Sequence, residues 1–148
     1  MSEKIDFNMN WLTDLDLETQ AFDKFLMQDN STNRDEILTN IENQNIELIK
    51  AKLNNKYDTE TIFTASVNDR HWLIVKILAI LVIYDFFRRN AARKIPKDYQ
   101  ERYEWAMKLL EDIKAGNEVP AGLPVYTDET GNEPNLLYGN NKNNDFYI

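Results

Sequence analysis

The sequence predicts an all-α fold: a four-helix bundle-like domain with an extended N-terminal segment and a C-terminal arm. Three observations predict it. Four glycines and four prolines in 148 residues are too few for a turn-dense β fold. Capping patterns or a helix-starting proline precede four segments in which apolar residues recur at helical spacing. One of these segments is apolar on nearly every face, so other helices must surround it.

The first helix is predicted over residues 14–27. Thr13 and Asp16 have the spacing of a capping box, in which each side chain accepts a hydrogen bond from the backbone of the other. Its apolar face consists of Leu15, Leu17, Phe22, Phe25 and Leu26.

The second helix is predicted over residues 33–54, where Thr32 and Asp35 repeat the capping pattern. Its apolar positions are Leu38, Ile41, Leu48, Ile49 and Leu53. The other positions are Asn, Gln, Glu and Lys, which are typical of a solvent-exposed face. Residues 57–67, rich in Asp, Thr and Ser, are expected to form a connecting loop.

The third helix is predicted over residues 69–92, with Ser66 and Asp69 as its start signal. It contains the run that is apolar on nearly every face, residues 72–87. That run is interrupted by Lys76 and Asp85 and is shorter than the roughly 20 residues of a membrane span, so we expect a buried core helix.

The fourth helix is predicted to begin at Pro96, because proline is tolerated at the first helical position. It is expected to end at Gly116, since glycine readily adopts the left-handed conformation that closes a helix. Its apolar stripe is Tyr99, Tyr103, Ala106, Leu110 and Ile113.

The predicted domain organisation is an N-terminal segment (1–12), a helical domain (13–116) and a C-terminal arm (117–148). Charge follows this division. Residues 1–30 have two basic and seven acidic side chains, and the arm has one and five, whereas residues 31–116 have fourteen and thirteen. Both ends are acidic, and the net charge of −8 argues against a protein that coats DNA or an anionic membrane.

Composition also argues against an enzyme. The chain has no cysteine, no glycine-rich phosphate loop and one histidine, so thiol chemistry and a multi-histidine metal centre are excluded. We expect His71 to be a partly buried, hydrogen-bonded structural residue. We therefore expect no catalytic residue, no metal site and no cofactor. The N-terminus has no apolar run of the kind found in signal peptides, and the cytoplasm is the expected compartment of synthesis.

Two groups of residues are candidates for a protein interface. The basic group contains Arg88, Arg89, Arg93, Lys94 and Lys97, and it would meet an acidic partner or line a DNA path. The alternative is that these charges only suit a helix C-terminus and pair with residues such as Asp85. The apolar group lies in the arm and contains Tyr126, Leu136, Leu137, Tyr138, Phe146, Tyr147 and Ile148. Because it has so many large apolar groups, we expect the arm to dock on a neighbouring protein. The alternatives are that it folds back on its own domain or is disordered. The acidic arm of a second copy would complement the basic group.

Several segments resemble a family of small phage virion proteins of the Mu type, itself similar to the head–tail connector (adaptor or head-completion) proteins of tailed phages. They are residues 53–59 (LNNKYDT), 83–89 (IYDFFRR), 96–106 (PKDYQERYEWA) and 109–116 (LLEDIKAG). The resemblance covers residues 12–124. Lys56 stands where the family has arginine, and Trp105 is shifted from the family's tryptophan position.

The resemblance implies a connector domain that assembles into a neck ring of about twelve copies between the portal and the tail. Its partners would be other copies of itself, the portal protein and tail or further neck proteins. DNA would be only passing cargo, and no membrane would be involved. The protein would then reside at the head–tail junction of the virion after synthesis in the host cytoplasm. The alternative is a small acidic cytoplasmic regulator of the DNA-mimic type that binds a host or phage protein.

Overall fold

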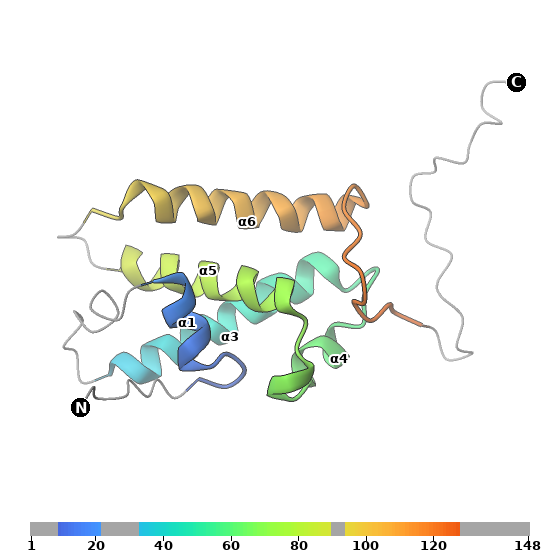
Figure 1. The fold of residues 1–148 in the computed structure, drawn as a ribbon, viewed down its shortest axis with the longest axis horizontal. Helices are drawn as coiled ribbons and strands as arrows, with labels where there is room; N and C mark the ends of the chain where they lie inside the picture. Colours follow the sequence, from blue (N-terminus) through green and yellow to red (C-terminus); the bar gives the residue numbers. More distant parts are fainter. Residues whose placement is uncertain (1–8, 22–32, 90–93, 128–148) are drawn as a thin grey trace, which may run out of the picture.

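The computed structural model describes residues 9–21, 33–89 and 94–127. Within them the chain forms five α-helices and one 3₁₀ turn, which confirms the all-α, bundle-like fold. They are α1 (Asp14–Gln20), α3 (Arg34–Leu53), α4 (Thr59–Thr64), η1 (Val67–Asp69), α5 (Trp72–Arg88) and α6 (Lys97–Ala115). In Figure 1, α5 and α6 run antiparallel side by side, α3 lies along the other side of α5, and α1 crosses in front.

Helix α5 is the centre of the core because it packs against α1, α3 and α6. Its buried residues are Ile74, Val75, Ile77, Leu78, Ala79, Ile80, Leu81, Val82, Ile83 and Phe86. Burying each large aliphatic side chain contributes about 1.5–3 kcal/mol, so this helix supplies much of the apolar free energy of folding. The expectation of a buried core helix is confirmed.

Helix α1 begins as predicted but is shorter. Thr13 and Asp16 form both hydrogen bonds of the capping box. The helix ends at Gln20, because Ala21 adopts an extended conformation with φ −148° and ψ 152°. The predicted continuation to residue 27 is therefore wrong at Ala21, and residues 22–27 lie outside the described part of the chain.

Helix α3 agrees with the predicted range, but its predicted cap and exposed face differ. Asn33 occupies the N-cap position and makes no capping hydrogen bond through its side chain, while Thr32 lies outside the described residues. The face expected to be solvent-exposed contains two buried polar residues, Glu42 and Asn45. Asn45 is satisfied by Ile41 O and by Asp85, at 3.0 and 2.9 Å from its Nδ2.

The predicted loop over residues 57–67 is wrong, because it contains α4. Asp58 caps this short helix by accepting a hydrogen bond from the backbone N–H of Thr61 at 3.2 Å. The start predicted for the third helix is also early. Ser66 Oγ donates to Asp69 at 2.6 Å and closes the 3₁₀ turn, so α5 begins only at Trp72.

The end of α5 is earlier than predicted, at Arg88, and residues 90–92 of the predicted range lie outside the described chain. Helix α6 begins one residue after Pro96 and ends at Gly116, which has φ +87° as its predicted role requires. Its predicted stripe faces the core, with Tyr103 only partly buried. Lys52 of α3 forms an ion pair with Glu111 of α6 and joins these helices at the surface.

Candidate protein interface

The described residues of the two predicted interface groups lie at opposite ends of the bundle. Arg88, Arg89 and Lys94 lie where α5 ends and α6 approaches, whereas Tyr126 lies beyond the other end of α6. One predicted residue of the basic group, Arg93, lies outside the described residues. The same holds for six predicted residues of the arm: Leu136, Leu137, Tyr138, Phe146, Tyr147 and Ile148.

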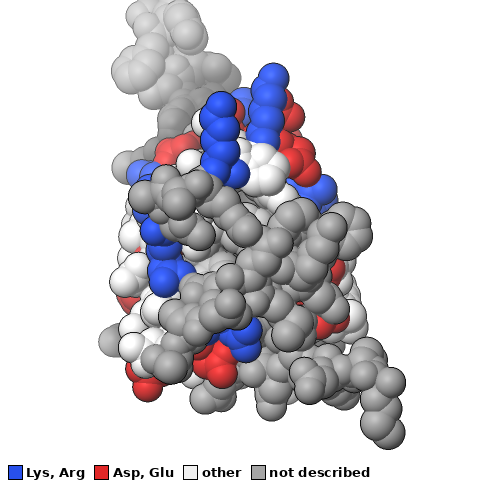
Figure 2. All heavy atoms as spheres, turned by 90° about the vertical axis from the view of Figure 1, so that its left-hand side faces the viewer, with Lys and Arg blue, Asp and Glu red and all other residues white. Residues whose placement is uncertain are grey.

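The basic end of the bundle is formed by Arg88, Arg89, Lys94 and Lys97, all exposed. The pairing with Asp85 is present, since Arg88 Nη2 lies 3.6 Å from the Asp85 carboxylate. The guanidinium of Arg89 lies 5.3 Å from the Phe86 ring centroid. Figure 2 looks onto this end of the molecule and shows lysine and arginine side chains at its margin, interspersed with acidic groups.

The opposite end is apolar. We define the apolar end by four exposed residues: Trp72, Val119, Val125 and Tyr126. Trp72 is 75% exposed although tryptophan is usually largely buried. Scattered exposed apolar residues are ordinary on a protein surface, but three of these four, Trp72, Val119 and Val125, line two hollows. The apolar end therefore combines exposed apolar side chains with two hollows in the protein surface.

Both hollows flank the segment that follows α6. The first, of about 700 Å³, lies between this segment and the end of α3, and Tyr57, Val119 and Val125 contribute to its lining. The second, of about 580 Å³, lies between α4, the start of α5 and the same segment, and Ile62 and Trp72 are among its lining residues. These dimensions suit side chains of a protein partner.

Backbone hydrogen bonds hold the segment after α6 in place. Tyr57 and Val125 form an isolated antiparallel bridge. Asp58 N–H donates to Pro124 O at 2.9 Å, and Tyr126 N–H donates to Lys56 O at 3.0 Å. The beginning of the predicted arm thus packs on its own domain, with Leu123 buried between its neighbours.

His71 is partly buried and hydrogen-bonded, as expected from the sequence. It is half-buried at the N-cap of α5, and its Nε2 lies 2.8 Å from Ala121 O. This contact ties the start of α5 to the segment after α6 and positions the neighbouring Trp72 at the rim of the second hollow. The described residues contain no group of three or more His, Cys, Asp or Glu side chains that could hold a metal ion.

Two ionisable groups at the apolar end have shifted pKa values. Burial lowers the pKa of Lys56. Its ammonium group lies close to Gly116, since Nζ would be 2.9 Å from a Cβ added at that glycine. The pKa of Asp58 is also lowered, first because the Thr61 hydroxyl donates to its carboxylate and then because the Thr61 backbone N–H does so. Asp58 therefore remains a carboxylate and keeps α4 capped.

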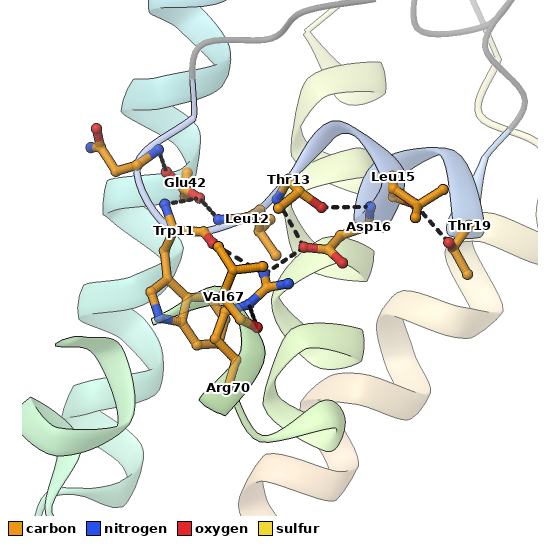
Figure 3. Close-up of polar contacts among 10 residues, drawn as sticks. Trp11, Leu12, Thr13, Leu15, Asp16, Thr19, Glu42, Val67 and Arg70 are labelled. Carbon is orange, nitrogen blue, oxygen red and sulfur yellow. Dashed lines mark hydrogen bonds and ion pairs between the residues drawn. The ribbon is translucent and has the colours of Figure 1, made fainter. Parts of the chain in front are cut away.

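An N-terminal clasp fixes residues 10–12 against α3 (Figure 3). The fully buried carboxylate of Glu42 accepts hydrogen bonds from three consecutive backbone N–H groups. The distances are 2.6 Å to Asn10, 3.1 Å to Trp11 and 2.7 Å to Leu12. One side chain thus satisfies donors that would otherwise be buried without partners as Trp11 and Leu12 enter the core.

A buried ion pair fixes the same segment from the other side. Arg70 Nη1 lies 2.5 Å from the Asp16 carboxylate, and both side chains are almost completely buried. Arg70 also donates to Trp11 O and Val67 O, each at 3.1 Å, and its guanidinium lies 5.3 Å from the Trp11 ring centroid. Asp16, predicted from the sequence as a capping-box residue, therefore also joins α1 to the segment that precedes α5 (Figure 3).

Sequence reasoning missed the surface next to Trp72. Lys76 lies one helical turn further along α5, and its Nζ is 5.0 Å from the ring centroid of Trp105 on α6. Trp105 is 42% exposed. We define the Trp72 surface as Trp72, Lys76 and Trp105. The available signal was the i,i+4 spacing of Trp72 and Lys76 on an otherwise apolar helix. Residues four apart lie on one helix face, and a charged side chain there indicates that this face reaches solvent.

Comparisons of the chain with protein-family models, with curated proteins and with solved structures give no match. None of the described helices is long and apolar enough to cross a membrane.

Proposed function

We propose that the chain is a non-enzymatic structural protein of a phage virion that forms a head–tail connector ring. In this proposal, about twelve copies surround the DNA exit channel between the portal protein and the tail or further neck proteins. DNA is only passing cargo, and the protein resides at the head–tail junction. The sequence resemblance suggests the place of assembly, and the two ends of the bundle suggest how copies associate.

The observation that carries the proposal is the chemical difference between the two ends of α5. The helix begins at exposed Trp72 at the apolar end and finishes at Arg88 at the basic end, about 25 Å away for a helix of its length. Contacts between unlike patches are heterologous, and they generate a ring when the rotation between copies closes. One subunit with two unlike patches has the form that a ring requires.

The net charge agrees with a channel wall. A subunit with a net charge of −8 repels phosphate and does not retain DNA in transit. The acid is concentrated toward the two ends of the sequence, while α5 and α6 carry both signs. A DNA mimic would instead need carboxylates along one face.

The direct test is quantitative mass spectrometry of purified phage particles that carry this gene. We expect a copy number equal to that of the portal protein or a simple multiple of it. Absence from the particle would contradict the proposal and favour a host-directed regulator.

A paired substitution tests the role of the apolar end. Trp72→Ser should leave DNA-filled heads without tails, because it removes the largest exposed apolar group at that end. Leu15→Ser is the matched control, since Leu15 is 69% exposed but lies on α1, outside the apolar end. Equal particle yields from both variants would count against this surface as the subunit contact.

A further inference from the structure

The Trp72 surface offers an unusual combination of groups for a partner. It presents two exposed indole rings and one ammonium group, with a hollow of about 580 Å³ beside Trp72. Tryptophan is enriched at the centres of protein interfaces, where it supplies large area with little loss of conformational freedom. A suitable occupant has apolar or aromatic side chains to cover the rings and acidic groups to meet the lysine.

The C-terminal residues 128–148 of this chain have that chemistry. Residues 128–148 contain four acidic side chains and one lysine. They also contain two apolar clusters, residues 136–138 (Leu-Leu-Tyr) and 146–148 (Phe-Tyr-Ile). The clusters are separated by polar residues, mostly asparagine. Charge and apolar character therefore both complement the Trp72 surface.

The described chain also ends near this surface. Gly122 and Pro124 line the same hollow as Trp72, and Thr127 is the last described residue. The twelve positions from Pro124 to residue 136 can span up to about 40 Å when extended, so the first apolar cluster can reach Trp72. A segment tethered so closely has an effective concentration of about 1 mM at this site, well above that of a second copy in dilute solution.

We propose that residues 128–148 of the same chain cover the Trp72 surface in the free protein. This inference rests on the proposed function in one respect: Trp72 belongs both to the covered surface and to the apolar end that contacts the next subunit. The tail is then an autoinhibitory cap, and assembly requires its exchange for a neighbouring copy. Free subunits remain monomeric until a partner displaces the tail.

The test uses the full-length protein labelled with 5-fluorotryptophan. Each of its three tryptophans gives one ¹⁹F resonance, assigned with Trp72→Phe and Trp105→Phe variants. A soluble paramagnetic agent broadens each resonance according to exposure. The tail variant Leu136→Asp/Leu137→Asp/Tyr138→Asp removes the first apolar cluster. The matched control, Asn140→Asp/Asn141→Asp/Asn143→Asp, adds the same charge to the same segment.

We expect the paramagnetic broadening of the Trp72 resonance to be about threefold greater in the tail variant than in the wild type or the control, because its indole becomes uncovered. The buried Trp11 should remain protected in all three proteins, which shows that the domain stays folded. Equal broadening of Trp72 in all three would overturn the proposal. So would protection of Trp72 that appears only on going from about 20 to 200 µM while the molecular mass rises, since the occupant would then be a second copy.

A second measurement does not depend on the tail variant. The chain has no cysteine, so Asn140→Cys accepts a single nitroxide label. The nitroxide should broaden Trp72 when both labels are on the same copy. It should not do so when fluorinated and nitroxide-labelled copies are mixed, and the reverse pattern would contradict the proposal. Either result is independent of the copy number in particles, so the two proposals fail separately.

Discussion

The clasp around Glu42 predicts a large and local effect of one substitution. In Glu42→Ala, the backbone N–H groups of Asn10, Trp11 and Leu12 lose their acceptor. A buried unsatisfied donor costs about 1–3 kcal/mol, so three of them would cost about 3–9 kcal/mol if the segment stayed in place.

Release of the segment limits that loss. Withdrawing Trp11 and Leu12 from the core costs about 3–6 kcal/mol at about 1.5–3 kcal/mol for each side chain. Freed backbone residues regain roughly 1–2 kcal/mol each of conformational entropy, which offsets part of that cost. We therefore expect Glu42→Ala to lower the free energy of unfolding by about 3 kcal/mol and to detach the N-terminal segment.

Glu42→Gln should cost less, about 1.5 kcal/mol, because an amide keeps one acceptor oxygen but directs an NH₂ group toward another donor. The control is Glu47→Ala on the same helix, whose side chain is 75% exposed and pairs with Lys50 across 3.8 Å. It should change the free energy by less than about 0.5 kcal/mol.

Two measurements check this reasoning. Urea denaturation gives the free energies, and hydrogen exchange of the Trp11 and Leu12 amides reports whether the segment detaches. A Glu42→Ala variant within about 0.5 kcal/mol of Glu47→Ala would refute the reasoning. So would a large loss of stability with the two amides still protected until global unfolding.

Three further predictions concern single residues. Arg70→Met should lower the free energy of unfolding by about 3–5 kcal/mol, because Asp16 is left as a buried, unpaired carboxylate; Arg70→Met/Asp16→Leu should recover part of this in the same denaturation assay. Gly116→Ala and Gly122→Ala should each cost about 1–2 kcal/mol, because φ is +87° and +79° at these positions. The Lys56 ammonium group that a Cβ at Gly116 would meet at 2.9 Å ends a flexible side chain and can move aside at little cost. Thermal melts compare these two variants, and a much larger cost at Gly116 than at Gly122 would contradict this reasoning. The lowered pKa of Asp58 contributes stability that is present above its ordinary value of 3.8 and is lost as pH falls through the folded-state pKa, so the melting-temperature difference between wild type and Asp58→Asn should shrink below about pH 4. A pH-independent difference would contradict this assignment.

Much of the fold could be predicted because its signals are local. The capping box of Thr13 and Asp16, the apolar run of α5 and the terminating Gly116 act within one or two helical turns. The contact between Arg88 and Asp85 is local in the same sense, since the two residues are three positions apart on one helix. Such features depend little on the packing of distant segments.

The candidate interface was only partly predictable, because exposure depends on what covers a residue. The basic residues were identified from their charge. Trp72 belongs to an apolar run that predicts burial, and its exposure depends on how the surrounding segments pack. Helix α4 was missed because it, too, depends on tertiary packing. It is six residues long, and isolated helices of that length are unstable in water without tertiary packing.

Local patterns in the sequence suffice to predict that the chain forms helices, which of them lies at the centre and where α6 ends. These properties follow from backbone preferences and from the spacing of apolar side chains along one helix. The burial of Glu42 and the exposure of Trp72 depend instead on how the helices pack. A polar side chain on α3 becomes internal only when a distant segment brings N–H groups that need an acceptor, and Glu42 meets residues about thirty positions earlier in the chain.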